Sequence, residues 1–280
     1  MAWQPTTFKR YVTCFPTSTG VALIVTDAGE AYIKALGNRE GPHALAREYV
    51  GTMLAQWFGL QTLEFAIMNV EPEDEIALGH DRRALPGPAF VTREIGGDSW
   101  GGSKRELALV ENTEDFTKLV VFDTWVRNRD RHSTPVLHPE SNLDNVFLTD
   151  EGVAGKKLRL MAIDNTHCFM PGERVTEDIA GDYACHDRDV YGLFPAFAPF
   201  VTQERVERCL EKLRLFDREE AATVVNAVPD EWDVSRVVRD AWIEFLVRRK
   251  AFLDDHLMDQ IGKICWPGRL LDNRSSEATS

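Results

Sequence analysis

The chain has 280 residues, of which 44% are apolar and 28% charged, and its formal net charge at pH 7 is −13. A chain of this size holds one large domain or two lobes with separate cores. The negative charge disfavours broad binding to nucleic acid or to an anionic membrane surface, and because no run of about 18 apolar residues occurs we expect no membrane span.

The cysteines and the N-terminus bear on the cellular compartment. Five cysteines are scattered along the chain, and no CxxC pair occurs. This pattern disfavours a zinc site or a disulfide framework. The opening sequence MAWQPTTFKR lacks the apolar stretch of a signal peptide. We therefore expect a reducing, cytoplasmic environment.

The first elements in chain order are a hairpin and a helix. Residues 21–26 and 31–36 are two strand-like runs, and the turn between them supplies Gly29 for a positive φ angle. Apolar residues then recur at helical spacing over residues 41–58, and Gly59 ends the pattern. A helix beside a small sheet is expected.

Two further strand patterns follow, over residues 62–70 and 89–95. The stretch between them is polar and rich in turn residues, which predicts a loop over residues 71–88. The Gly-rich segment GGDSWGG over residues 96–102 comes next. We expect the chain to cross there from one lobe to another, and a cleft between lobes is a common place for a small ligand.

The rest of the chain is mainly helical. The predicted elements are a helix over residues 112–128 capped by Asn112 or Thr113, paired strands over 145–152 and 157–169, and helices over 217–228 and 235–257. The sequence therefore predicts an α+β fold. Its strand-rich N-lobe would comprise residues 1–97, its mainly helical C-lobe residues 98–270, and its disordered tail residues 271–280.

Lys34 and Glu48 are candidates for a charged pair. Alternation places Lys34 on one face of its strand with Tyr32, where it either lies solvated at a sheet edge or points into the cleft. Glu48 follows fourteen residues later on the predicted helix. A helix packed on the sheet would bring this carboxylate to the lysine and hold the ammonium ready to neutralise phosphate oxygens.

Hydroxyl residues precede the first hairpin strand. Thr17, Ser18 and Thr19 stand directly before Gly20. Backbone N–H groups and hydroxyls in such a loop suit phosphate contacts, although an ordinary loop has the same composition. The sequence contains neither GxxxxGK[ST] nor GxGxxG.

Three polar residues further on match the needs of phosphoryl transfer. Asp130 follows an apolar helix, Asn145 opens a strand and Asp164 ends the next strand. If the two strands form a hairpin, Asn145 and Asp164 meet at one edge. The reaction needs a carboxylate to orient the attacking hydroxyl and oxygen ligands for Mg²⁺. The alternative is plain loop chemistry, which these residue types also suit.

Several neighbours of these residues are expected to be structural. Asn142 lies three residues before Asn145, and we interpret it as a turn or capping residue. His132 is expected to support its loop. Arg127, Arg129 and Arg131 alternate in the sequence, so at least one is expected to be solvated. The spacing of His138, His167 and His186 does not indicate a metal site.

Six stretches of the sequence carry a resemblance to a known family. In chain order they are YIKALG, ALAREYVGTMLAQWFGL, WVRNRDRH, NLDNVFL, LMAIDNTHCF and VPDEW with the helix after it. Together they resemble the HipA-like kinases, and more distantly the catalytic loop of the phosphoinositide kinases. The resemblance covers about residues 11 to 258. It implies a two-lobed protein-kinase-like fold with ATP and Mg²⁺ between the lobes.

The resemblance also implies residue roles. Lys34 is similar to the phosphate-contacting lysine and Glu48 to its partner, and Asp130 to the catalytic aspartate. Asn145 and Asp164 resemble the metal ligands. The strand AFVTREI, with Val91 and Arg93, resembles the hinge segment that hydrogen-bonds adenine. The chain departs from the family pattern by an insertion over residues 133–141 and by Asn-Thr-His after the second aspartate.

Three hypotheses follow. The first is a kinase that uses ATP and Mg²⁺ to phosphorylate a hydroxyl-bearing partner, with a protein Ser or Thr as the acceptor that the resemblance implies. The second is a pseudokinase that binds nucleotide without transfer. The third is AMP transfer, in which the nucleotide binds in the opposite sense. A protein that only binds has no physical need for Asp130.

Overall fold

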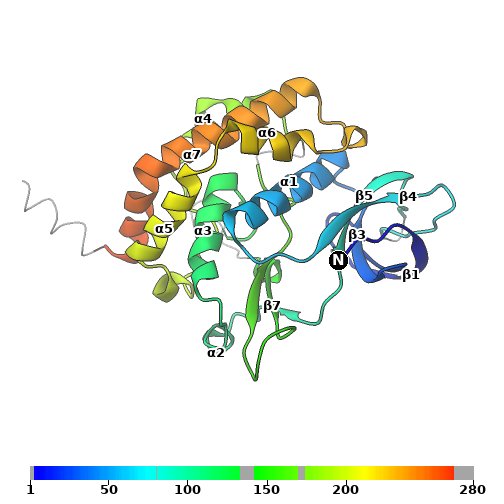
Figure 1. Cartoon of the computed structure of the whole chain (residues 1–280), viewed down its shortest axis with the longest axis horizontal. Coiled ribbons are helices and arrows are strands. Elements are labelled where there is room, and N and C mark those ends of the chain that lie inside the picture. Colours follow the sequence, from blue (N-terminus) through cyan, green and yellow to red (C-terminus); the bar gives the residue numbers. More distant parts are fainter. Residues whose placement is uncertain (1–2, 80, 133–141, 170–173, 268–280) are drawn as a thin grey trace, which may run out of the picture.

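The computed structural model describes residues 3–79, 81–132, 142–169 and 174–267. An antiparallel sheet forms the N-terminal part and helices form most of the C-terminal part (Figure 1), which confirms the predicted α+β class. The insertion with His138 and the predicted disordered tail lie outside the described residues.

The N-terminal sheet has five strands in the order β1-β2-β3-β5-β4, and all its pairs are antiparallel. The strands are β1 (Phe8–Cys14), β2 (Ala22–Thr26), β3 (Gly29–Lys34), β4 (Phe65–Val70) and β5 (Gly87–Arg93). The predicted hairpin is confirmed, because β2 pairs with β3 and Gly29 at the turn has a φ of 108°. Strand β5 pairs with β3 on one side and β4 on the other, so it is an inner strand.

Strand β1 was not among the predicted strands. Its burial does not alternate along FKRYVTC, and its register with β2 shifts twice. An edge strand with a weak apolar face gives little periodic signal in the sequence. The predicted loop before β5 is confirmed in its position, although Ile76 and Leu78 within it are buried against the sheet.

Helix α1 (Pro42–Phe58) lies between the sheet and the other helices (Figure 1). It ends where predicted, because Gly59 adopts a left-handed conformation with a φ of 86°. Twelve of its residues are buried, since it contacts β5 on one side and α3 and α6 on the other. This central position lets α1 carry side chains to the junction of the two parts.

The C-terminal part contains a small sheet and the remaining helices. The sheet has the order β6-β7-β8 and comprises β6 (Asp98–Ser99), β7 (Val146–Thr149) and β8 (Arg159–Ala162). The α-helices are α2 (Lys104–Leu107), α3 (Glu114–Val126), α4 (Asp182–Cys185), α5 (Gln203–Arg214), α6 (Arg218–Asn226) and α7 (Arg236–Cys265). The described residues also form the 3₁₀ turns η1 (Leu143–Asn145), η2 (Glu177–Ala180), η3 (Ala198–Phe200) and η4 (Asp230–Trp232).

Helix α7 runs further than predicted, since its pattern continues through the buried residues Leu257 and Ile261. The predicted start of α6 is confirmed, because the side chain of Asp217 accepts hydrogen bonds from the N–H groups of Glu219 and Glu220. Within the described part of the chain, no helix combines the length and apolar character that crossing a membrane requires.

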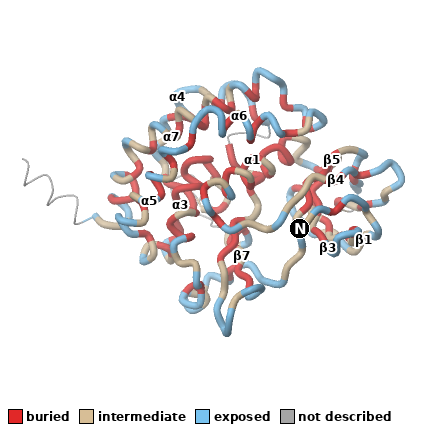
Figure 2. The backbone as a smooth tube through the Cα atoms, viewed as in Figure 1, coloured by how far each residue is buried: buried red, intermediate tan, exposed pale blue. Residues whose placement is uncertain are grey.

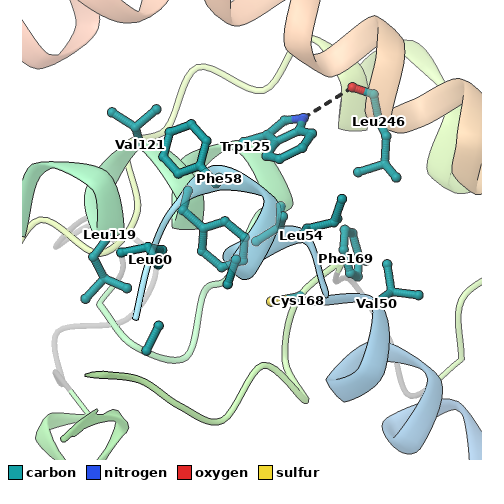
Figure 3. Packing of buried hydrophobic residues seen from close by; sticks show 14 of the residues in the cluster. Val50, Leu54, Phe58, Leu60, Leu119, Val121, Trp125, Cys168, Phe169 and Leu246 are labelled. Carbon is teal, nitrogen blue, oxygen red and sulfur yellow. Dashed lines mark hydrogen bonds between the residues drawn. The ribbon is translucent and has the colours of Figure 1, made fainter. Parts of the chain in front are cut away.

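The main core joins α1 to the helical part. Figure 3 shows Phe58 of α1 packed near Trp125 of α3, whose indole donates a hydrogen bond of 3.2 Å to the carbonyl of Leu246 in α7. The buried backbone in Figure 2 follows α1 and α3, whereas the outer turns of α5, α6 and α7 include exposed residues. A shared core of this kind fixes α1 relative to the segments that follow α3 and β8.

Candidate active site

A buried ion cluster forms where β3, α1 and the end of β8 meet. The Nζ of Lys34 lies 2.7 Å from Oε2 of Glu48 and 2.9 Å from Oδ1 of Asp164. The predicted approach of Glu48 to Lys34 is therefore present. It arises because β3 directs Lys34 toward the buried face of α1, where Glu48 is 4% exposed.

The opposite charges in this cluster stabilise the ionised forms of Lys34 and Asp164. Burial disfavours the ammonium of Lys34, but the carboxylates of Asp164 and Glu48 outweigh burial and raise the pKa of the lysine. Burial likewise opposes ionisation of Asp164, yet the charge of Lys34 and the hydroxyl of Thr166 lower the pKa of this carboxyl. Lys34 and Asp164 are thus charged at neutral pH.

Backbone geometry at Asp164 is unusual for a residue other than glycine. Its φ is +53°, in the left-handed region, which such residues rarely adopt and which is concentrated at functional sites. Two contacts with α1 hold the next residue: the N–H of Asn165 donates to Glu48 at 3.1 Å, and its side-chain amide donates to Thr52 at 3.2 Å. Helix α1 therefore fixes both Lys34 and the segment that carries Asp164.

Gly51 permits this close approach. A Cβ atom on Gly51 would lie 2.5 Å from Cβ of Asn165. We expect Gly51→Ala to destabilise the protein by about 1–3 kcal/mol through overpacking, against a gain of up to about 1 kcal/mol from helix propensity. Urea unfolding of the two proteins measures the difference. A more stable Gly51→Ala variant would contradict the packing described here.

Asp130 lies in the loop after α3 and receives donors from two asparagines. The side-chain amide of Asn145 donates to Oδ2 of Asp130 at 2.7 Å, and that of Asn142 donates to the same oxygen at 3.0 Å. Asn142 also caps η1, because its Oδ1 accepts from the N–H of Asp144. The predicted capping role of Asn142 is confirmed, and its contact with Asp130 is additional.

The pKa of Asp130 follows from these contacts. Burial raises it, but His167 and the two asparagine amides outweigh burial and lower the pKa below its ordinary value. The carboxyl is consequently ionised at neutral pH.

The β7–β8 hairpin and Arg131 bring Asp130, Asn145 and Asp164 together. Because Val146 pairs with Ala162, the two candidate metal ligands flank the same end of the hairpin, as the sequence predicted. Arg131 donates to the carbonyl of Asn145 and, at 3.1 Å, to that of Ile163. One guanidinium thus ties the Asp130 loop to both strand ends.

The expectation of at least one solvated arginine in this loop applies only to Arg129, and only in part. Arg127 and Arg131 are fully buried, and the side chain of Arg129 is 20% exposed. Each has a carboxylate partner that removes the need for solvent: Arg131 pairs with Asp123 at 2.9 Å, and Arg127 pairs with Asp187 at 2.8 Å. His132 stacks on Phe194 with its ring centroid 4.9 Å away, which agrees with a structural role.

A cavity of about 260 Å³ adjoins the ion cluster. Its lining includes Lys34, Glu48 and Asp164 together with the apolar side chains of Phe90, Ile95 and Phe147. Both parts of the chain contribute to it, as the expected cleft requires.

The predicted hinge residues Val91 and Arg93 belong to β5 but do not line the cavity. Among the described residues that line the cavity, Phe90, Thr92 and Ile95 are present, whereas Val91 and Arg93 are not. Val91 is buried in the sheet, and the N–H of Arg93 donates to the carbonyl of Glu64. Because β5 is an inner strand, its neighbours occupy this backbone.

The predicted phosphate-loop residues lie between β1 and β2. Thr17 Oγ1 accepts a 3.0 Å hydrogen bond from the N–H of Val21, and Thr19 is buried, so both support the loop itself. Ser18 is exposed. Within the described lining of the cavity, this loop contributes Val21 and not the three hydroxyl residues.

Sequence reasoning missed three neighbours of the cluster. Thr166 hydrogen-bonds Asp164, and His167 lies 3.4 Å from both Asp130 and Glu40. The sequence signal that could have indicated Thr166 and His167 was the polar run Asn-Thr-His directly after Asp164. The fold places this run beside the loop that carries Asp130. The distant partner Glu40 has no local signature.

Comparisons with known proteins agree with this geometry. The model of the family described as HipA-like kinase matches residues 18–252. The crystal structure of a Helicobacter pylori proinflammatory kinase, CtkA, is similar in fold, with a TM-score of 0.57 and 13% identity over 92% of this chain and 99% of that chain. No curated protein matches the chain. At this identity the structural likeness concerns the fold, whereas the family match bears on the activity.

Proposed function

The chain belongs to the HipA-like kinase family, and from that premise we propose that it transfers the γ-phosphoryl group of ATP to a hydroxyl group in the presence of Mg²⁺. The acceptor that we propose is a serine or threonine of a protein. The observation that carries the proposal is the position of Lys34, whose ammonium contacts both Glu48 and Asp164 at the edge of the cavity.

The cavity suits a nucleotide in one orientation. Leu63, Phe90 and Phe147 give apolar surface for the base, and Lys34 is the cation for the phosphate oxygens. Ile95 follows β5 and lines the cavity. We therefore assign the hinge contact to the backbone near Ile95 in place of Val91 and Arg93.

The candidate metal ligands fit a hard cation. Asn145 and Asp164 offer an amide and a carboxylate oxygen, the ligand types that Mg²⁺ prefers. The hydrogen bonds of Asp164 to described residues end on Oδ1, so Oδ2 is the oxygen that we assign to the metal. Bound Mg²⁺ supplies positive charge that neutralises the phosphate oxygens.

We assign Asp130 as the group that orients the acceptor hydroxyl and accepts its proton. Its contacts with described residues all end on Oδ2, so Oδ1 is the oxygen that faces the hydroxyl in this proposal. The lowered pKa keeps the carboxylate ready to accept a hydrogen bond at neutral pH.

The domain division remains part of the proposal. Residues 1–97 would form the N-lobe with Lys34 and Glu48, and residues 98–270 the C-lobe with Asp130, Asn145 and Asp164. The supporting observation is that the cavity draws its lining from both segments.

Isotopic labelling tests the reaction. We expect label from the γ-phosphate of ATP to appear on a protein acceptor, and label from the α-phosphate to remain in the nucleotide. Transfer of the α-label would indicate AMP transfer. Transfer of neither label to added protein substrates, together with intact nucleotide binding, would support a pseudokinase.

Nucleotide binding is testable without a substrate. Ligand that binds only the folded state adds roughly 2.7 kcal/mol at about 100 times its Kd, so millimolar Mg-ATP is expected to raise the Tm. Lys34→Ala should shrink this rise, measured from its own nucleotide-free Tm, because phosphate contacts are lost. Arg236→Ala is the matched control, since this side chain is 84% exposed on α7. An unchanged Tm of the wild type in Mg-ATP would contradict nucleotide binding.

A further inference from the structure

His167 bridges two carboxylates that come from distant parts of the chain. Its Nδ1 lies 3.4 Å from Oδ2 of Asp130, and its Nε2 lies 3.4 Å from Oε1 of Glu40. Asp130 belongs to the loop after α3, whereas Glu40 lies between β3 and α1. The imidazole thus joins the catalytic loop to the segment between β3 and α1.

The surroundings favour a charged ring. Contacts with Asp130 and Glu40 raise the pKa of His167 to about 10, although burial opposes the charge. Glu40 in turn lies 3.7 Å from Arg47. At neutral pH the bridge is therefore an imidazolium between two anions.

The contact with His167 restricts the orientation of the Asp130 carboxylate. His167 and the amides of Asn142 and Asn145 all approach the same oxygen, Oδ2. The two amides come from the β7 side of this carboxylate, whereas the imidazole comes from the segment after β8. Contacts from two directions at one oxygen restrict rotation of the carboxylate, which leaves Oδ1 in one orientation.

We propose that His167 is a positioning residue that, together with Glu40, orients the carboxylate of Asp130 for transfer to the acceptor hydroxyl. This inference rests on the proposed function of Asp130. The imidazole does not exchange a proton with substrate; it acts through the carboxylate that it contacts. The hydrogen bonds from Asn142 and Asn145 alone would leave the side of the Asp130 carboxylate that faces His167 without a contact.

Kinetics of variants tests the role. We expect His167→Ala to lower kcat by about 10- to 100-fold, on the scale of lost supporting contacts, while KM for ATP and the Mg-ATP rise in Tm stay near those of the wild type. His167→Asn should recover part of kcat, since its amide can donate toward Asp130. His186→Ala is the matched control, because this histidine is half-exposed beside α4.

A double-mutant cycle adds the second partner. Glu40→Gln should lower kcat in the wild-type background but have little further effect in His167→Ala, because both changes break one bridge. Full additivity of the two changes would overturn the coupling. So would an unchanged kcat in His167→Ala, or a loss in His167→Asn as large as that in His167→Ala.

NMR titration separates this inference from the proposed function. If the wild type transfers no γ-phosphate, the kinase proposal fails, but the bridge is still measurable as the pKa of the His167 imidazole. We expect Asp130→Asn and Glu40→Gln each to lower that pKa, because each removes an anion next to the ring. A His167 pKa that is the same in all three proteins would overturn the bridge.

Discussion

Replacing Asp130 by asparagine or alanine is expected to lower the rate of γ-phosphoryl transfer by about 10²- to 10⁴-fold, the usual effect of losing a general base. The carboxylate has a lowered pKa, and its Oδ2 accepts from two asparagine amides and lies 3.4 Å from Nδ1 of His167, so its charge and orientation are both set by the fold. Asparagine keeps the shape but cannot accept the proton. Single-turnover transfer from γ-labelled ATP measures the loss.

Nucleotide binding should survive the same change. Asp130 is not among the described residues that line the cavity, so the rise in Tm with Mg-ATP is expected to stay near that of the wild type. Asp144→Ala is the matched control, because this exposed aspartate belongs to η1 close to the same loop. Undiminished transfer by Asp130→Asn would require another residue as the base.

The parts of the site that could be predicted depend on short-range periodicity. Strand alternation placed Lys34 on one face of its strand with Tyr32, and the helical pattern placed Glu48 on the next element. The contact between the two side chains could therefore be proposed, whereas the burial of Lys34 stayed open. The pairing of Asn145 with Asp164 at one edge followed from hairpin geometry, because antiparallel strands joined by a short turn bring their outer ends together.

The parts that could not be predicted depend on how distant elements pack. The strand order places β5 between β3 and β4, and this non-local pairing is what occupies the backbone around Val91 and Arg93. Glu40, which precedes α1, and His167, which follows β8, come within 3.4 Å of each other only through tertiary packing. Neither fact has a periodic signature in the sequence.

The burial of the loop arginines has the same origin. Alternating arginines in a polar loop suggest solvent exposure, but Arg131 pairs with Asp123 inside α3 and hydrogen-bonds two strand ends. A buried charge of this kind is stable only with its partners in place, and these partners become neighbours only after α3 and the hairpin have packed together.

Replacing Asp164 is expected to have the largest effect on the dependence on Mg²⁺. Asp164→Asn removes a full negative charge from a hard cation that prefers anionic oxygen, and it also removes a partner of Lys34. We expect a loss of about 10²- to 10³-fold in kcat, comparable to the removal of one preorganised electrostatic group. Titration of Mg²⁺ against transfer rate should show a higher metal requirement.

Asn145→Ala and Asn142→Ala make a matched pair for the same titration. Both amides donate to Asp130 Oδ2, so both changes disturb that carboxylate, and a difference between them isolates the metal. Asn145 is 4% exposed at the start of β7 beside the end of β8, and its replacement should raise the Mg²⁺ requirement severely. Asn142 caps η1, and its replacement should mainly cost stability, about 0.5–2 kcal/mol as for other lost caps.

The opposite result would be equally informative. If Asn142→Ala raised the Mg²⁺ requirement and Asn145→Ala left it unchanged, the asparagine that follows the insertion would be the metal ligand. The amide oxygen of Asn142, which accepts from Asp144 in this structure, would then have to leave its cap when the metal binds. Since that exchange breaks the cap of η1, the Asn142→Ala variant would lose less stability in the presence of Mg-ATP than in its absence, which urea unfolding under both conditions can measure.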